Sequence, residues 1–308
     1  RRRGPVGVPR APRLRWRCRH IRRRLHGHLI MGRVVRPVVR PVIRDVVRAA
    51  AGSAIAGGGV AAWSPLSLFA AGEKGVWYDP SDFSTMWQDT AGTTPVTAVG
   101  QSVARIDDKS GNGKHATQAT PARRPLLQES GGKYYLDFDG TDDSLATAAI
   151  DFSASDEMTI CVGVRKETDS SARVIAALRD SPLTNGAVYL TGPAFTAPTF
   201  GYSSQGTVLS ANNVNNATYA APFLGVVSAR SKISTDYLSG RINAVDVFSS
   251  IGDQGTGNYA NDAIYIANSP YYSDYFNGRI YQMIVRGAAT ADLTDVEDYV
   301  AGKTGVTL

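Results

Sequence analysis

The sequence predicts an all-β fold, an antiparallel sandwich or jelly roll, with a short helix at the C-terminus. Short runs of residues alternate between apolar and polar side chains and are separated by clusters of Gly, Asn, Asp, Ser and Pro, which is the pattern of strands joined by turns. The chain also contains 31 Gly, and only 19% of its residues are charged. Both values are typical of a turn-rich β protein. Many short strands of this kind favour a sandwich or a jelly roll.

The length and the cysteines narrow the class further. The 308 residues suffice for one large domain or two small ones. Cys18 and Cys161 are the only cysteines and lie far apart, which excludes the dense disulfide framework of small secreted domains. Three of the four histidines fall within the first 28 residues, so nothing has the spacing of a zinc site.

Charge divides the chain into two unlike parts. Residues 1–48 contain 16 Arg and one acid, a balance of +15, whereas residues 49–308 contain 17 basic and 26 acidic residues, a balance of −9. An Arg-rich segment of this kind suits the phosphates of nucleic acid or an anionic lipid surface, since each guanidinium is a permanent charge with a fork of donors.

Residues 1–30 have a composition that favours a different origin. They contain no Met, no Lys and no acid, and the first methionine of the chain is Met31. A bias towards one residue type is expected of translated upstream DNA, so this segment is interpreted as mistranslated or disordered and is left out of the fold. The alternative is a true nucleic-acid-binding arm, in which case nucleic acid is a partner.

Residues 31–70 are expected to form a basic, Ala- and Gly-rich arm or linker that is extended or partly helical. Pro37 and Pro41 disfavour a helix in its first half, so a helix would begin near Pro41. Residues 49–72 carry no charge but are mostly Ala and Gly, so we expect no membrane span. A four-residue repeat would place four arginines in one stripe of such a helix, as candidates for docking on nucleic acid or on a particle: Arg36, Arg40, Arg44 and Arg48.

Residues 71–308 are expected to form the β domain. One clear strand places its apolar side chains on one side and faces solvent with the other, as in a half-buried antiparallel sheet; the inward residues are Met158, Ile160, Val162 and Val164, and the outward ones are Thr159, Cys161, Gly163 and Arg165. Further alternating runs lie at 134–138, 186–190, 223–229, 242–248, 263–267 and 279–286.

A single helix is predicted, close to the C-terminus. Thr294 and Glu297 have the spacing of a capping box. Leu293, Val296 and Val300 recur on one side of such a helix. Gly302 is expected to end it.

Several segments resemble a known superfamily. The segments are DDKSGNGKHATQ (107–118), YYLDFDGTDDSLAT (134–147), MTICVGVRK (158–166) and FNGRIYQMIVRGAATADLTDVEDYVAGKTG (276–305). They resemble the concanavalin A-like, laminin G-type jelly rolls. The opening SLFAAGEKGVWYDPSDFSTMWQDTAGTTPVTAVGQ (67–101) is more specifically similar to a group of tailed-bacteriophage structural proteins.

The resemblance implies a virion structural or decoration protein that is made in the bacterial cytoplasm, contacts other virion proteins, and forms a homo-oligomer. The superfamily also contains lectins, glycosidases and purely architectural domains. A retaining glucanase of this superfamily would show two glutamates and an aspartate alternating along one strand. All five glutamates of this chain are isolated, so no catalytic residue carries over and we expect no enzyme.

An acidic motif is the candidate metal site. DFDGTDD places four carboxylates within seven residues: Asp137, Asp139, Asp142 and Asp143. Hard cations bind such oxygen ligands, with Ca²⁺ the natural candidate. The alternative, which we favour, is that the carboxylates cap turns and accept backbone amides, with no cofactor bound.

An aromatic cluster before the Asn277-Gly278 turn is the candidate carbohydrate site. It comprises Tyr271, Tyr272, Tyr275 and Phe276. An aromatic ring can stack on the apolar face of a sugar, and the alternative is packing or a subunit contact. Trp77 and Trp87 are assigned to packing, and His115 to a turn. The two leading functions are therefore a virion structural protein and a carbohydrate-binding module that contacts host-surface glycans, and both can hold together.

Overall fold

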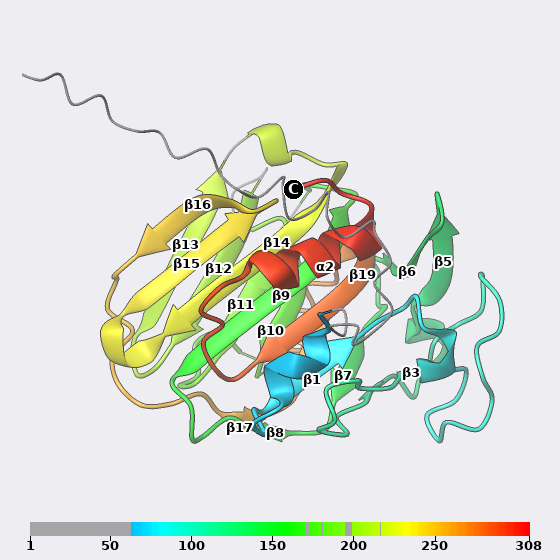
Figure 1. Ribbon diagram of the computed structural model, residues 1–308, viewed down its shortest axis with the longest axis horizontal. Helices are drawn as coiled ribbons and strands as arrows, with labels where there is room; N and C mark the ends of the chain where they lie inside the picture. The colour runs from blue at the N-terminus through cyan, green and yellow to red at the C-terminus, as the bar shows by residue number, and fades with distance from the viewer. Residues whose placement is uncertain (1–62, 171–172, 180, 195–198, 216) are drawn as a thin grey trace, which may run out of the picture. The chain divides into compact units, whose positions relative to one another are not determined.

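The computed structural model describes residues 63–170, 173–179, 181–194, 199–215 and 217–308. Within them, two antiparallel sheets pack face to face (Figure 1). This arrangement confirms the predicted jelly-roll sandwich. No helix among the described residues is long and apolar enough to cross a membrane.

The first sheet has eight strands. Its order is β16-β15-β14-β9-β19-β6-β5, with β1 paired to β19. The strands are β1 (Gly75–Tyr78), β5 (Leu126–Ser130), β6 (Lys133–Asp139), β9 (Glu157–Lys166), β14 (Phe223–Lys232), β15 (Tyr237–Ile242), β16 (Val245–Ser250) and β19 (Asn277–Arg286).

The second sheet has nine strands, in the order β13-β12-β11-β10-β18-β7-β4-β3-β2. They are β2 (Met86–Trp87), β3 (Arg105–Ile106), β4 (Ala116–Thr117), β7 (Leu145–Thr147), β10 (Val174–Leu178), β11 (Val188–Thr191), β12 (Thr199–Gln205), β13 (Leu209–Asn215) and β18 (Ile264–Ile266). A separate pair joins β8 (Ile150–Asp151) to β17 (Asn261–Asp262).

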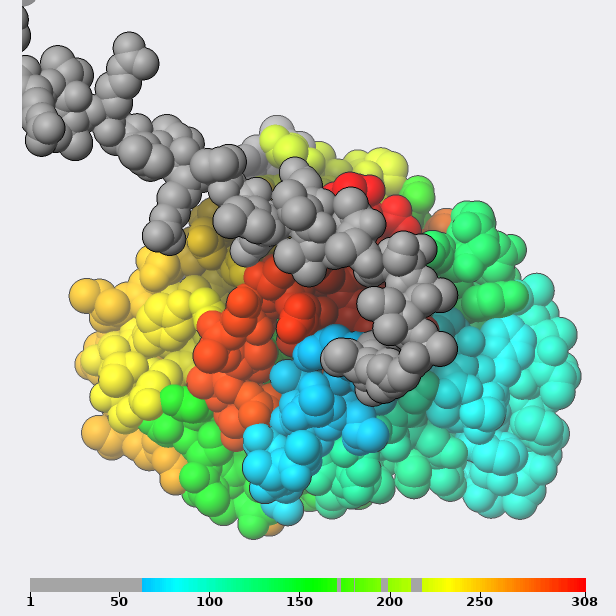
Figure 2. All heavy atoms as spheres, viewed as in Figure 1, coloured from blue at the N-terminus to red at the C-terminus, as the bar shows by residue number. Residues whose placement is uncertain are grey.

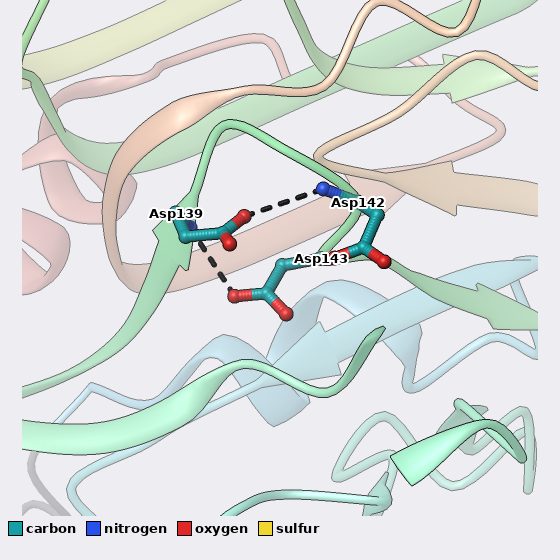
Figure 3. A group of neighbouring side chains, drawn as sticks. All are labelled: Asp139, Asp142 and Asp143. Carbon is teal, nitrogen blue, oxygen red and sulfur yellow. Dashed lines mark hydrogen bonds between the residues drawn. The ribbon is translucent and has the colours of Figure 1, made fainter. Parts of the chain in front are cut away.

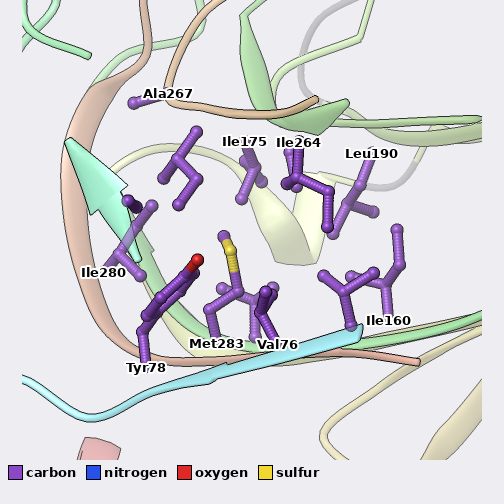
Figure 4. Packing of buried hydrophobic residues seen from close by; sticks show 14 of the residues in the cluster. Val76, Tyr78, Ile160, Ile175, Leu190, Ile264, Ala267, Ile280 and Met283 are labelled. Atoms are coloured by element: carbon purple, nitrogen blue, oxygen red, sulfur yellow. The ribbon is translucent and has the colours of Figure 1, made fainter. Parts of the chain in front are cut away.

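The main core lies between the two sheets and is built from the inward side of each strand. Figure 4 shows Ile160 and Met283 of the eight-stranded sheet pointing towards Ile175 and Leu190 of the nine-stranded sheet. Removing this apolar surface from water is the main favourable contribution to folding.

Strand β9 differs from its prediction on one side. Met158 and Val162 enter the main core as predicted. The opposite face was expected to meet solvent, but Cys161 is fully buried in a second apolar cluster. The reason is that helix α2 (Thr294–Thr304) lies over this face (Figure 1). Strands buried on both faces lose the clean apolar and polar alternation.

The predicted helix exists, but its two ends differ from the prediction. The N-cap is Leu293 and makes no side-chain cap, so the capping box of Thr294 and Glu297 is wrong. Glu297 instead points into the sheet and is 1% exposed. The helix continues past Gly302 to Thr304, and the next residue, Gly305, has a φ of 83°, as in a left-handed glycine cap.

The alternating run 242–248 is a hairpin rather than one strand. Ile242 ends β15 and Val245 begins β16. Asn243 and Ala244 between them have φ values of 50° and 63°, the left-handed pair of a tight two-residue hairpin turn. Alternation continued across the turn and concealed it.

The described fold begins before residue 71. A short 3-10 helix, η1 (Pro65–Phe69), packs beside α2. Trp63 meets the ring of Tyr299 edge-on at 5.9 Å. Figure 2 shows the N-terminal residues of the described chain in blue beside the red C-terminal residues on this face. The segment that sequence assigned to the end of a linker therefore covers part of the eight-stranded sheet.

Candidate ligand-binding groove

A groove of about 170 Å³ lies on the outer face of the nine-stranded sheet. Strand alternation explains its floor: Val188 and Leu190 point into the main core, so Tyr189 and Thr191 point outward. The lining residues come from strands β10 to β13 and two loops: Val174, Pro182, Leu183, Tyr189, Thr191, Gly201, Tyr202, Ser203, Leu209, Ala211, Tyr272 and Asp274.

The loop between β18 and β19 forms one wall of the groove. Tyr272 donates its backbone N–H to Ser269 O at 3.2 Å, and Val174 donates its own to Asp274 O at 3.1 Å. The first bond lies within the loop, and the second holds the loop against β10. Tyr272 is 40% exposed, so its ring is accessible, and partial burial raises its pKa.

Asp274 is the only carboxylate that lines the groove among the described residues. Burial raises its pKa, and the nearby Arg173 charge opposes that shift. Farther along the floor, Tyr189 donates its hydroxyl to Arg179 O at 3.1 Å. The groove thus joins an accessible aromatic ring, hydroxyl groups and one carboxylate.

The aromatic cluster predicted from sequence separates in the structure. Tyr272 lines the groove, whereas Tyr271 does not. The two rings meet edge-on, with their centroids 4.6 Å apart. Tyr275 is half-buried and does not line the groove. Phe276 is 0% exposed in the main core, so its assignment to a carbohydrate site is wrong. The chain has already turned inward there to begin β19.

Sequence reasoning missed most of the groove. The outward pair Tyr189 and Thr191 is visible as alternation within the predicted strand 186–190 and its extension. Pairing of β11 with β10 and β12 brings Val174 and Ser203 beside them, and no local signal reports such pairing.

Three of the four predicted metal-ligating aspartates lie together at the end of β6 (Figure 3). Oxygens of Asp139, Asp142 and Asp143 lie within 4.8 Å of one another, whereas Asp137 is not in this group. Asp137 lies opposite Arg279 on β19. The arrangement offers oxygen ligands of the kind that Ca²⁺ takes.

The same carboxylates accept hydrogen bonds from the turn itself. Asp139 Oδ1 accepts the N–H groups of Thr141 at 2.7 Å and Asp142 at 3.3 Å, and Asp143 Oδ2 accepts the N–H of Asp139 at 3.2 Å. Burial raises the pKa of Asp143 to about 6. These contacts fit the turn-capping alternative.

A second, charged depression of about 640 Å³ lies where α2 meets the loop after β1. Asp79, 1% exposed, accepts from Lys303 Nζ at 2.9 Å and from the Tyr299 hydroxyl at 3.4 Å. Lys109 donates to Asp82 at 2.6 Å. The charged side chains of this depression are therefore paired with one another. The contacts of Asp79 join the loop after β1 to helix α2.

The remaining described residues singled out from the sequence lie outside the groove. Trp77 is 6% exposed in the cluster under α2, and Trp87 donates its indole N–H to Asp107 at 2.8 Å. His115 directly precedes β4; its Nδ1 accepts the backbone N–H of Asp108 at 3.2 Å and lies 2.9 Å from an Asp107 oxygen. Four glutamates are held in ion pairs with Arg or Lys: Glu73, Glu157, Glu167 and Glu297. The basic stripe, Arg36, Arg40, Arg44 and Arg48, lies outside the described residues.

No family model and no curated protein matches this sequence, but solved structures match the fold. The binding domain of Paraclostridial Mosquitocidal Protein 1 aligns with a TM-score of 0.50 and 11% identity, covering 66% of this chain and 51% of that chain. The botulinum neurotoxin serotype G binding domain aligns with a TM-score of 0.50 and 11% identity, covering 63% of this chain and 48% of that chain. This chain therefore spans about half the length of these proteins, and the likeness is one of fold.

Proposed function

We propose that the chain is a non-catalytic, lectin-type carbohydrate-binding protein whose ligand occupies the groove of the nine-stranded sheet. One observation carries the proposal: Tyr272, whose ring is accessible, lines the same groove as the polar residues Thr191, Ser203 and Asp274. A ring face stacks on the apolar side of a sugar, while a few polar groups hold its hydroxyls. The fold is similar to that of two proteins described as binding domains.

The carboxylates support binding rather than hydrolysis. Glycosidases generally work with two carboxyl groups that flank the scissile bond, and Asp274 alone lines the groove in the described part of the chain. Glu167, the nearest glutamate to β10 in the sequence, is held by Arg165 at 2.7 Å and Arg279 at 3.0 Å.

A glycan array probed with the full chain tests the proposal. We expect binding to at least one glycan class and a loss of at least about tenfold, or 1.4 kcal/mol, in Tyr272→Ala. Tyr271→Ala is the matched control, since Tyr271 is more exposed but lies outside the lining, and it should retain most of the affinity.

Two outcomes would contradict the proposal. One is the absence of binding to every glycan offered, with the unfolding transition intact. The other is an equal loss in both tyrosine variants, which would place the site elsewhere on the loop. Both variants should change the free energy of unfolding by less than about 0.5 kcal/mol, since exposed side chains contribute little to stability.

We further propose that this binding protein is carried on a bacteriophage particle, where it contacts other virion proteins, assembles as a homo-oligomer and meets host-surface glycans. The similarity of residues 67–101 to phage structural proteins supports this location, and the basic residues before Trp63 suit docking on the particle. Mass mapping of purified particles should find the polypeptide and define its first residue. Its absence from every particle preparation would overturn the location but leave the carbohydrate-binding proposal intact.

A further inference from the structure

We infer that the groove selects uncharged sugars that carry a methyl group, as 6-deoxyhexoses and N-acetylhexosamines do. The inference rests on the proposed carbohydrate-binding function and specifies its ligand class. It follows from the way in which polar and apolar side chains are distributed along the groove.

The strand register orders the groove into rows. Thr191 pairs with Val174 on one side and with Gly201 on the other. The backbone carbonyl of Asp274 accepts the N–H of Val174. This row is the polar end of the groove. Thr191 and Asp274 can hold sugar hydroxyls there.

The next row still carries the hydroxyls of Tyr189 and Ser203, and the large aliphatic side chains of the lining begin beyond it. Ser203 pairs with Tyr189 and Ala211, and one row farther Gln205 pairs with Leu209. The loop that carries Leu183 returns at this end, because Gly186 donates its N–H to Gln205 O at 2.8 Å.

The side chains that line the far end of the groove are aliphatic. They are Pro182, Leu183 and Leu209. Leu183 is 61% exposed and Leu209 is 40% exposed, so water now covers large apolar side chains. Exposed apolar groups that gather around one concavity mark an interaction site.

Pro182, Leu183 and Leu209, the described residues of these walls, offer a sugar hydroxyl no side-chain partner. A hydroxyl placed against them would lose its hydrogen bonds to water, which is unfavourable. A methyl group placed there instead removes apolar surface from water on both sides.

Charge restricts the ligand in the same direction. Among the described residues of the lining, Asp274 is the only one with a charged side chain, and Arg173, whose charge acts on Asp274, lies outside the lining. An acidic substituent would meet the Asp274 carboxylate, and like charges repel. Uncharged sugars are therefore favoured over uronic acids.

Matched sugars that differ at one carbon provide the test. D-fucose, D-galactose and D-galacturonic acid differ only at C6, which carries CH₃, CH₂OH and COO⁻; the same comparison is made for 6-deoxy sugars of the manno and gluco series. N-acetylhexosamines and their parent hexoses form the second arm, which distinguishes an acetamido methyl from a 6-deoxy methyl. Affinities of the full chain are measured for each pair.

We expect the methyl-bearing member of at least one pair to bind about tenfold or more tightly than its parent, the discrimination that one such group gives in an apolar pocket, and the uronic acid to bind most weakly. Parents that bind as well as or better than every methyl-bearing partner would overturn the inference but leave the carbohydrate-binding function standing. No binding by any sugar, parent or methylated, would overturn both.

Leu183→Ser tests the aliphatic wall directly, with Leu66→Ser as the matched control. Leu66 is similarly exposed, at 52%, but lies on η1 over the other sheet. We expect Leu183→Ser to lower the preference for the methyl-bearing sugar at least about threefold while affinity for the parent is retained, and Leu66→Ser to change neither. An equal loss of parent and methylated sugar in Leu183→Ser would contradict the assignment of the methyl group to this wall.

Discussion

The outer faces of the two sheets differ in whether another element packs on them. The face of the eight-stranded sheet is covered by α2 and η1 (Figures 1 and 2), whereas the face of the nine-stranded sheet carries an open groove. The covered face contributes burial and ion pairs, and the open face exposes aromatic and aliphatic side chains. The comparison contrasts a face that is closed by packing with a face on which we propose that a ligand binds.

Close contact between backbone and helix makes the covered face possible. Gly163 on β9 lies so near α2 that an added Cβ would be 2.3 Å from Thr304 Oγ1 and 3.1 Å from Val300 Cγ1. Glu297 anchors the helix from below, accepting a hydrogen bond from the Ser228 hydroxyl and pairing with Arg241 at 3.2 Å.

Removing the buried carboxylate should have the largest effect on the covered face. Glu297→Ala leaves Arg241 and Ser228 without their partner beneath the helix, and loss of one member of a buried pair costs about 3 kcal/mol. Chemical denaturation measures the change in the free energy of unfolding. Asp298→Ala, one residue farther along the same helix and exposed, removes the same charge and should change it by less than about 0.5 kcal/mol. Equal effects of the two variants would show that Glu297 is not an anchor.

A side chain at Gly163 should separate the helix from the sheet. We expect Gly163→Val to lower the free energy of unfolding by about 1–3 kcal/mol, since overpacking forces the neighbours to move. Gly302→Ala is the control, because a Cβ there meets nothing within 4 Å, and it should raise the stability by about 0.5–1 kcal/mol as expected for alanine in a helix. A neutral Gly163→Val would mean that α2 lies farther from β9.

The turn that links the two sheets should give a smaller, pH-dependent effect. The folded-state pKa of Asp143 is about 6, raised from 3.8, so the folded chain holds this proton more tightly than the unfolded chain. The resulting stability is present below about pH 4 and is lost as pH rises through 6, by about 1–3 kcal/mol. In Asp143→Asn this part of the pH dependence should disappear.

Unfolding of both proteins between pH 4 and 7 provides the measurement. The difference between wild type and Asp143→Asn isolates this one group from the other carboxyls. Parallel pH curves would contradict the raised pKa. If Ca²⁺ binds the Asp139, Asp142 and Asp143 cluster, its addition should raise the unfolding temperature of wild type but not of Asp143→Asn; the turn-capping interpretation predicts no shift in either.

The inward and outward side chains of a strand could be predicted from sequence where the strand packs against the core on one face only. Leu136 and Phe138 of β6 entered the core as their spacing predicted. The predictions failed where another element supplied the environment: α2 buried Cys161, and the inward turn of the chain buried Phe276. In both cases the pattern of neighbouring residues carries no information about the element that packs against them.

The groove depended on long-range pairing in the same way. Tyr272 was among the predicted aromatic residues, but Tyr189, Ser203 and Leu209 reach it only through the register of β11, β12 and β13. Ser203 and Tyr189 are ordinary members of separate strands when each is considered alone.

By itself, the sequence determined the fold class, the alternation of most strands, the C-terminal helix and the division between an Arg-rich N-terminus and an acidic domain, because composition and periodicity are local properties. The tertiary structure decided which sheet face is covered, where Glu297 points, which tyrosine lines the groove, and which residues from distant strands form it. Those outcomes depend on the packing of one element against another, which lies beyond the reach of any window of neighbouring residues.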